Sequence, residues 1–441
     1  MRSFALTWIL CTNHAIAWIT ISFQRVAETN RRTSLKVSLS GDINNSDSEV
    51  RSPLGASIEE LSNILGGRGR ALACWECLRI GVDPSWYFSK EANEKEPQTF
   101  DMNTNGGIEK NELNIQGVLG KQAYFSLANL ANVERDVAKL TQICTSVDGT
   151  KKFLLQLRDG LEIESVIIPW DDRGSSTLCI SSQVGCRQGC TFCATGRMGK
   201  LRSLSRDEIL SQVYWANKIC RLENTLYRME NIVFMGMGEP GDNVEEVIAA
   251  TNTLVDHNMF GFASKRVTIS TVGPHPDVFA KIAEAPAVIA WSVHATRQEV
   301  RNALVPTTKF SMEELREGLL TALEGRSRSL NSTMLEVTLL RGINDSVEDA
   351  LSLIAFCRPI QEKVAKLVVN LIPWNSIGAS SGYLSLFEPP SPESVMAFQS
   401  ILTKNGIRCY VRTTRGDDEN AACGQLATKR KARVNVIAAK S

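Results

Sequence analysis

The sequence lacks an excess of charge of either sign, and this absence limits what the chain can bind as a whole. Its 49 lysine and arginine residues are balanced by 48 aspartate and glutamate residues, which gives a formal net charge of +1. A uniformly basic surface is therefore excluded, and contact with any polyanion must come from local basic patches. Hydrophobic residues make up 43% and charged residues 22% of the chain, which is ordinary globular composition.

A long uninterrupted hydrophobic run is also missing. The stretch from Phe4 to Ile21 is broken by Thr12, Asn13 and His14, which argues against a membrane span. Residues 25–36 are then basic and rich in Ser and Thr, and an apolar stretch followed by such a segment is typical of an organelle-targeting presequence. We therefore expect residues 1–50 to be a presequence and linker. They would direct the chain to the chloroplast, or to the mitochondrion, and leave a mature form without membrane contact. A short N-terminal anchor, a wrong start site and a cytoplasmic protein are the alternatives.

The twelve cysteines lack the spacing of a small secreted disulfide scaffold. Cys186, Cys190 and Cys193 instead form a C-x3-C-x2-C triplet with no histidine close by in sequence. Gly185 and Gly189 allow the backbone to curl, so that the three sulfurs face one centre. A structural zinc usually takes four protein ligands, whereas three cysteines on a [4Fe–4S] cluster leave one iron open to a substrate. The triplet favours the iron–sulfur cluster and a reducing compartment, with a zinc knuckle or a chance cluster as the alternatives.

Strands and helices alternate through most of the chain. From Thr145, two Asp-Gly turn signals bracket alternating residues, which predicts a β-hairpin. Capping boxes at 205–208 and 311–314 open two of the later helices. Short strands are expected at 177–182, 231–235, 267–270, 288–293, 334–340, 367–372 and 409–412. The pattern predicts an α/β fold, a partial (βα)6 barrel with its chemistry at the carboxyl ends of the strands.

Three further segments complete the expected domain organisation. Residues 51–144 are expected to form a small helical domain, with apolar positions at helical spacing from Ser57 to Val82 and a polar insertion at 91–112. Cys74 and Cys77 lie inside the apolar helix and are expected to be ordinary core cysteines. Residues 145–426 are expected to form the barrel domain and residues 427–441 a basic tail.

Several motifs resemble the RlmN/Cfr family of radical-SAM RNA methyltransferases. They are SSQVGC before the triplet, ATG after it, TLC upstream, GMGEP at 236–240 and TRGDDENAACGQL at 414–426. Glu419 and Asn420 differ from the Ile-Asp that is commoner in the C-terminal motif, and extra residues (WDDRGSST) separate Pro169 from Cys179. The resemblance spans about residues 55–426. It implies a radical-SAM barrel with a [4Fe–4S] cluster on the triplet, S-adenosylmethionine (SAM) as the second cofactor, and an RNA-binding helical domain.

The same resemblance assigns the contacts with SAM to residues that end predicted strands or follow them. A GxGEP sequence alone is weak evidence, because strand-to-helix turns often contain glycine, and His294 alone would more often be a core histidine. The motifs occur along the chain in the order expected for the family, which favours a SAM-binding site over these alternatives. The implied SAM contacts are Gly238, Glu239, Ser270, Ser292, Val293, His294 and Asn375.

The resemblance also implies the reaction. Cys423 would carry a methyl group as S-methylcysteine, and Cys179 would resolve the protein–RNA adduct by removing the ring proton and closing a disulfide with Cys423. Glu164 would bind or deprotonate the target base, although an exposed strand glutamate is the alternative. Candidate phosphate contacts are Arg197, Lys200, Arg202 and the tail residues Lys429 to Arg433.

The expected activity is methylation of carbon 2 of adenine in large-subunit ribosomal RNA, and in transfer RNA, with a flavodoxin or ferredoxin as the electron donor. Within the family the rival is methylation of carbon 8. A glycyl-radical-activating enzyme would share the cysteine triplet but has no need of Cys179 and Cys423. A zinc-bearing RNA-binding module is the alternative that is not an enzyme.

Overall fold

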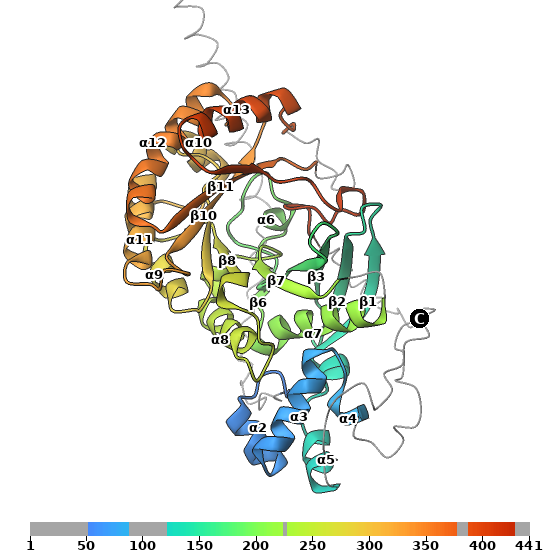
Figure 1. Ribbon diagram of the computed structural model, residues 1–441. Helices are drawn as coiled ribbons and strands as arrows, with labels where there is room; N and C mark the ends of the chain where they lie inside the picture. Colours follow the sequence, from blue (N-terminus) through green and yellow to red (C-terminus); the bar gives the residue numbers. More distant parts are fainter. Residues whose placement is uncertain (1–51, 88–120, 224–226, 377–386, 428–441) are drawn as a thin grey trace, which may run out of the picture. The chain divides into compact units, whose positions relative to one another are not determined.

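The computed structural model describes residues 52–87, 121–223, 227–376 and 387–427. Within these residues, one open sheet has the strand order β1-β2-β3-β4-β7-β8-β9-β10-β11-β12 (Figure 1). The expected presequence, polar insertion and basic tail lie outside the described residues.

Three antiparallel strands form one edge of this sheet. They are β1 (Ala138–Thr145), β2 (Lys151–Leu157) and β3 (Glu162–Trp170). The expected turns contain Gly149 and Gly160, each with φ of 81°, a conformation that favours glycine. The predicted hairpin is therefore confirmed. β1 belongs to the sheet as well, so the sheet begins at Ala138 rather than after residue 144.

The remaining strands of the sheet run parallel, as the strand–helix alternation predicts. Neighbouring strands pair in register, for example Cys179 with Val233 and Leu335 with Trp291. Because parallel strands share a direction, their carboxyl ends all lie on the same side of the sheet, at the ends of the strands. The parallel strands are β4 (Ser175–Cys179), β7 (Met229–Phe234), β8 (Val267–Thr271), β9 (Val288–Ser292), β10 (Ser332–Leu339), β11 (Lys366–Pro373) and β12 (Cys409–Val411).

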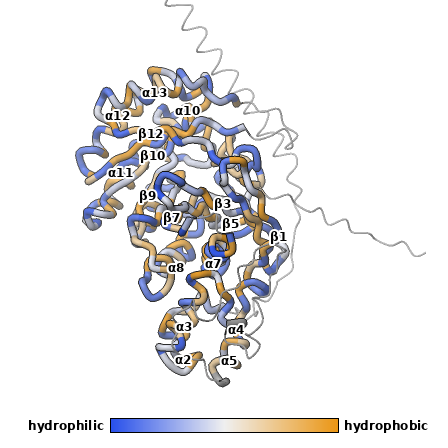
Figure 2. The backbone as a smooth tube through the Cα atoms, turned by 45° about the vertical axis from the view of Figure 1, so that its right-hand side comes forward, coloured by the Kyte–Doolittle hydropathy of each residue, from blue (hydrophilic) through white to orange (hydrophobic). Residues whose placement is uncertain are grey.

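Helices cover the outer side of the parallel strands (Figure 1). The two predicted capping boxes are confirmed, because Ser205 and Ser311 each accept a hydrogen bond from the backbone of the glutamate three residues on. Along α12 and α13, hydrophobic and hydrophilic residues alternate, as expected of helices with one face on a core (Figure 2). These helices are α7 (Arg206–Leu222), α8 (Val244–Val255), α9 (Asp277–Ala283), α10 (Gln298–Leu304), α11 (Met312–Leu323), α12 (Val347–Lys363) and α13 (Pro392–Lys404).

The described residues before the sheet form four short α-helices and one π-helical turn (Val133–Val137), and contacts with α7 come from the second of these α-helices and from the π-helical turn. Cys74 and Cys77 are completely buried there, which confirms that they are core residues. Arg79 donates hydrogen bonds to backbone carbonyls of the loop after α8, and its own carbonyl accepts one from Asn217 of α7 at 2.8 Å. No helix among the described residues is long and apolar enough to span a membrane. The four helices are α2 (Ile58–Leu65), α3 (Arg68–Arg79), α4 (Pro84–Tyr87) and α5 (Lys121–Ala128).

Candidate active site

The three clustered cysteines lie in a loop, residues 185–201, that we call the cysteine loop. It is closed by antiparallel pairing of β5 (Gln183–Val184) with β6 (Arg202–Ser203). At the start of the loop Gly185 has φ of 75°, and a Cβ there would lie 1.9 Å from the carbonyl oxygen of Gly199. Only glycine can occupy this crossing, because both the backbone angle and the close approach exclude a side chain.

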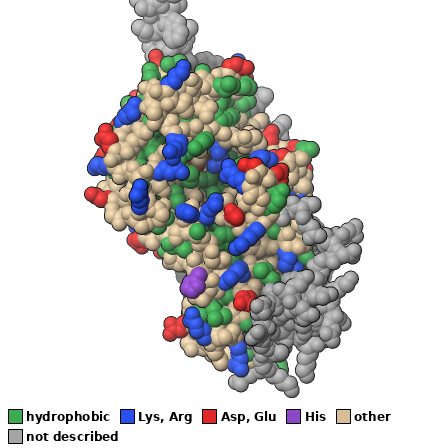
Figure 3. Space-filling view, viewed as in Figure 1, with side chains coloured by type: hydrophobic (Ala, Val, Ile, Leu, Met, Phe, Trp, Pro, Cys, Tyr) green, Lys and Arg blue, Asp and Glu red, His purple; other side chains and the backbone are tan. Residues whose placement is uncertain are grey.

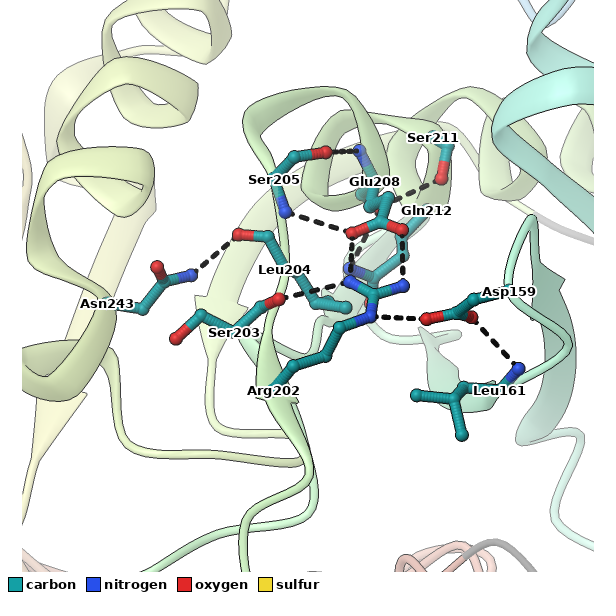
Figure 4. A network of polar contacts seen from close by, with 10 residues as sticks. All are labelled: Asp159, Leu161, Arg202, Ser203, Leu204, Ser205, Glu208, Ser211, Gln212 and Asn243. Atoms are coloured by element: carbon teal, nitrogen blue, oxygen red, sulfur yellow. Dashed lines mark hydrogen bonds and ion pairs between the residues drawn. The ribbon is translucent and has the colours of Figure 1, made fainter. Parts of the chain in front are cut away.

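A network of charged residues holds the base of the cysteine loop (Figure 4). The Arg202 guanidinium donates two hydrogen bonds of 2.7 Å to the Glu208 carboxylate and one of 2.6 Å to Asp159. Glu208 also accepts the backbone N–H of Ser205 at 2.9 Å, so the same carboxylate caps α7. All three guanidinium nitrogens of Arg202 are engaged in this way. Arg202 therefore joins β6 to α7 and to the turn before β3, and its contact with phosphate stays a prediction.

The three cysteines of the loop line one pocket. Burial raises the pKa of the Cys186 thiol and raises that of Cys190 to about 12. Such thiols stay protonated unless a bound metal ion stabilises the thiolate. Three soft sulfur donors on one loop fit an iron–sulfur cluster by their chemistry.

No group of three or more His, Cys, Asp or Glu side chains that could hold a metal ion is found among the described residues. In a [4Fe–4S] cluster each thiolate binds a different iron, so its cysteines need not converge on one point. The three cysteines of the loop would therefore bind three different irons of the cluster.

The pocket, which we call the central pocket, lies at the carboxyl ends of the parallel strands. It gathers most of the site residues predicted from the sequence, although they are spread over almost 250 positions. Among the described residues, Val293 and Glu164 lie outside its lining. The predicted residues that line it are Cys179, Cys186, Cys190, Cys193, Gly238, Glu239, Ser270, Ser292, His294, Asn375 and Cys423.

Glu239 presents a fixed carboxylate to the central pocket. The residue follows β7 and accepts the backbone N–H groups of Gly241 and Val272, each at 2.9 Å. It is only 2% exposed, and this burial raises its pKa to about 7. Gly238 has φ of 106°, and a Cβ there would meet the Gln183 side chain at 2.7 Å. A buried carboxylate held in this way can accept hydrogen bonds from an amino group.

Three polar side chains at the ends of β8 and β9 face the same space. The hydroxyl oxygens of Ser270 and Ser292 lie 3.2 Å apart. His294 has φ of 56°, an uncommon conformation for a residue other than glycine, and its Nδ1 accepts the backbone N–H of Thr338 at 3.2 Å. Burial lowers the His294 pKa well below its usual value. The neutral ring therefore carries its proton on Nε2 and can donate it to a ligand.

Arg301 was missed by the sequence analysis, although it supports these strand ends. Its side chain is completely buried and donates hydrogen bonds to the carbonyl oxygens of Val272, Ser292 and Val293. Burial lowers its pKa to about 10, while nearby Cys190 and Glu239 oppose that shift. Val293 thus contributes a carbonyl to this arginine. The signal was absent because Arg301 lies on a helix, outside every motif.

Cys179 and Cys423 reach the central pocket from different ends of the chain. Cys179 ends β4, and burial together with nearby Cys423 raises its pKa to about 12. Cys423 lies in the pocket wall, and burial of its thiol raises the pKa of Cys423 to about 11, although Arg412 opposes the shift. Asn375 donates to the Cys423 carbonyl at 3.2 Å, so this amide positions the thiol-bearing segment.

Glu164 lies behind the pocket rather than in it. Its carboxylate accepts the backbone N–H of Ala427 at 3.0 Å and lies 3.6 Å from the Lys152 ammonium group. Burial raises the pKa of Glu164, and Lys152 opposes the shift. Lys152 also donates to the carbonyl of Asn420 at 3.2 Å. This buried pair therefore fixes the C-terminal motif, and contact of Glu164 with a substrate base stays a prediction.

Basic side chains surround the site on one face of the molecule. In Figure 3, Lys and Arg side chains gather around a hollow lined with hydrophobic side chains. Arg197 is exposed and donates weakly to the Thr191 carbonyl at 3.4 Å, and Lys200 is exposed. Both side chains can reach an anionic partner, as the sequence analysis expects. The tail residues 429–433 lie outside the described residues.

Comparison with known proteins identifies similar sequences and structures. Residues 180–354 match the Radical SAM superfamily. The "Dual-specificity RNA methyltransferase RlmN" of Ruthia magnifica subsp. Calyptogena magnifica is 39% identical over 284 residues, which cover 64% of this chain and 76% of the relative. The protein of the same name from Vesicomyosocius okutanii subsp. Calyptogena okutanii is 40% identical over 285 residues, with the same coverage. A radical SAM methyltransferase from Sphaerobacter thermophilus has a similar structure, with a TM-score of 0.67 and 29% identity over 85% of this chain and 99% of the other.

The charged network at the base of the cysteine loop yields a stability prediction. Replacing Arg202 with Met leaves the largely buried Glu208 carboxylate without its cation. We expect the free energy of unfolding to fall by about 1–3 kcal/mol in urea denaturation. Arg341→Met is the matched control, because both partners of its ion pair with Glu388 are about two-thirds exposed (66% and 69%). Equal losses in the two variants would contradict the structural role of Arg202.

The cysteine loop yields a prediction about metal content. In Cys190→Ala, anaerobically purified protein should lose most of its iron and sulfide, together with the broad visible absorbance of the cluster, because one corner loses its ligand. Cys220→Ala is the control, since this partly buried cysteine lies on α7, outside the central pocket. Normal iron content in Cys190→Ala would show that the loop does not hold the cluster.

Proposed function

The chain belongs to the RlmN family of radical-SAM methyltransferases, which use a [4Fe–4S] cluster and SAM, and we propose that it methylates carbon 2 of adenine in RNA. The proposed substrates are large-subunit ribosomal RNA and transfer RNA. The observation that carries the proposal is the meeting of Cys179 and Cys423 in the pocket that the cysteine loop lines. Two further thiols beside three cluster ligands match a reaction in which the protein itself carries the methyl group.

The cofactor side of the pocket would hold SAM. When bound, the cluster supplies the electron that cleaves SAM to methionine and a 5′-deoxyadenosyl radical. Glu239 is held in place by hydrogen bonds from two backbone N–H groups and would accept hydrogen bonds from the amino group of SAM. Ser270, Ser292 and the Nε2–H of His294 would bind its ribose and carboxylate. Arg301 keeps these side chains in place through the strand-end carbonyls.

Cys423 would be the methyl carrier. Carbon 2 of adenine is not a nucleophile, so direct polar transfer from SAM to the ring fails. The Cys423 thiolate would instead take the methyl group from one SAM, which leaves as S-adenosylhomocysteine. Loss of a hydrogen atom from this methyl group, to the radical from a second SAM, gives a carbon radical that adds to the ring. The place of Cys423 in the pocket wall suits both steps.

Cys179 would release the product. The adduct would lose one electron to an acceptor such as the oxidised cluster and its ring proton to the Cys179 thiolate, which restores the aromatic base, still joined to Cys423 through a thioether. Cys179 would then give up that proton and attack the Cys423 sulfur as a thiolate. The bond to the transferred carbon breaks, and that carbon takes a proton to become the methyl group. The disulfide must be reduced before the next cycle. A flavodoxin or ferredoxin is the proposed electron donor for the cluster.

Nucleoside analysis tests this function. RNA incubated with the protein, SAM and a reductant under anaerobic conditions should yield 2-methyladenosine, detected by mass spectrometry after digestion. Appearance of 8-methyladenosine would assign the rival carbon. Cleavage of SAM without any methylated nucleoside would favour the glycyl-radical-activating class instead.

The two pocket thiols should have separable roles. Cys423→Ala should neither acquire a methyl group nor modify RNA, because the carrier sulfur is gone. Cys179→Ala should still be methylated at Cys423 and should add to RNA, but the thioether should persist. Denaturing gels should then show a covalent protein–RNA species that is absent from the double variant. Normal turnover in Cys179→Ala, or crosslinked RNA in Cys423→Ala, would show that the roles are misassigned.

The N-terminal residues are proposed to be an organelle address. Residues 1–40 fused to a fluorescent protein should direct it to the chloroplast, or to the mitochondrion, because they combine an apolar run with a basic, hydroxyl-rich segment. A chain that begins near Ser52 should fold and methylate RNA as well as the full-length chain. Even cytosolic fluorescence of the fusion would contradict the targeting proposal.

A further inference from the structure

The turn between β3 and β4 carries residues that the proposed reaction leaves unused. Trp170 ends β3 and lines the central pocket, and the next four residues form the turn. The guanidinium carbons of Arg173 and Arg415 each lie 5.4 Å from the centre of the Trp170 ring. The indole N–H donates to the Thr177 hydroxyl at 3.0 Å, which fixes the orientation of the ring. An oriented aromatic ring with two cations therefore stands in the pocket wall.

Both arginines, Arg173 and Arg415, can bind an anion. Arg173 pairs with Asp172 at 3.3 Å, but their side chains are 66% and 68% exposed, so this pair contributes little and is easily exchanged. Arg415 lies 4.0 Å from the Asp148 carboxylate, at the limit of an ion pair. The Nε of Arg415 is buried and has no hydrogen-bond partner among the described residues. A phosphate would give both guanidinium groups a stronger anionic partner than these weak pairs.

Resting on the proposed RNA methyltransferase activity, we propose that Trp170, Arg173 and Arg415 bind the nucleotide next to the target adenine. An adenine that enters the central pocket must leave the base stack, which uncovers a face of the neighbouring base. That face stacks on the Trp170 indole once Arg173, on its exposed turn, moves aside. The guanidinium groups then bind the phosphates that flank the extruded nucleotide. We call these three residues the rim site.

Direct RNA binding tests the rim site. The probe is a fluorescein-labelled single-stranded RNA of about 12 nucleotides with a central adenine, followed by anisotropy at several salt concentrations. Trp170→Ala should weaken binding about tenfold, the effect of losing one base stack. Arg173→Ala should lower the slope of log affinity against log salt by about 0.7, the value for one phosphate contact on a single strand.

Two matched variants serve as controls. Arg341→Ala removes an arginine whose exposure and ion pair match those of Arg173, and Tyr410→Ala removes an exposed aromatic side chain from β12. Both should bind the probe as the unmodified protein does. Methylation of Cys423 from SAM, measured by mass spectrometry without RNA, should be unchanged in every rim variant. This second readout separates a substrate site from damage to the catalytic pocket.

The outcomes distinguish the rim site from the proposed function. If the unmodified protein methylates RNA but Trp170→Ala binds the probe as tightly, or Arg173→Ala behaves like Arg341→Ala, the rim site is wrong and the function stands. If the unmodified protein methylates no RNA, both are overturned. If Trp170→Ala unfolds, Trp170→Phe and Trp170→Leu replace it. Trp170→Phe keeps an aromatic ring and must bind the probe more tightly than a Trp170→Leu variant of the same stability. The salt dependence of Arg173→Ala tests the rim site independently.

Discussion

The segment after β12 closes a gap that the sheet leaves open, and the arrangement of the active site depends on this closure. β1 and β12 are the two edges of the sheet, so neither strand supplies the other with backbone partners. The C-terminal motif crosses between them. The Asp418 carboxylate accepts from Ser146 and from the backbone of Val147 in the β1–β2 turn, and the Gly416 N–H donates to Asp148 at 3.1 Å. The same segment then reaches the cysteine loop, where the Ala194 N–H donates to the Gly424 carbonyl at 2.8 Å. Cys423 is held between these two attachments.

Buried charges stabilise the arrangement because each of them has partners. Glu239 is paired with backbone N–H groups, Glu164 with Lys152 and a backbone N–H, and Arg301 with three carbonyl oxygens. An isolated charge at any of these depths would cost several kcal/mol, so each group constrains the backbone that satisfies it. Arg301 and Glu239 in this way fix the strand ends of β7, β8 and β9. Lys152 and Glu164 fix the C-terminal motif from the opposite side.

The sequence predicted most of the fold, because capping boxes, Asp-Gly turns and strand–helix alternation are local signals. Short motifs also pointed to residues that the fold brings together in the central pocket. The sequence could not show that Glu164 lies behind the pocket wall. Alternation along β3 separates the two faces of the strand, but it does not show which face a later segment will cover. The sequence likewise could not show that Arg202 pairs with Asp159 and Glu208, because these partners become neighbours only when the cysteine loop closes. Arg301 lies on a helix with no motif, so only the fold reveals it.

The central pocket is built from two kinds of structure. One side comes from the repeated strand–helix units, whose carboxyl ends are fixed by parallel pairing and are therefore rigid. Its other side comes from parts outside that repeat, which are the β3–β4 turn with Trp170 and the crossing segment with Arg415 and Cys423. Both of these parts attach to the antiparallel strands β1–β3. Changes in that turn can therefore alter one side of the pocket while the strand ends on the other side keep their geometry.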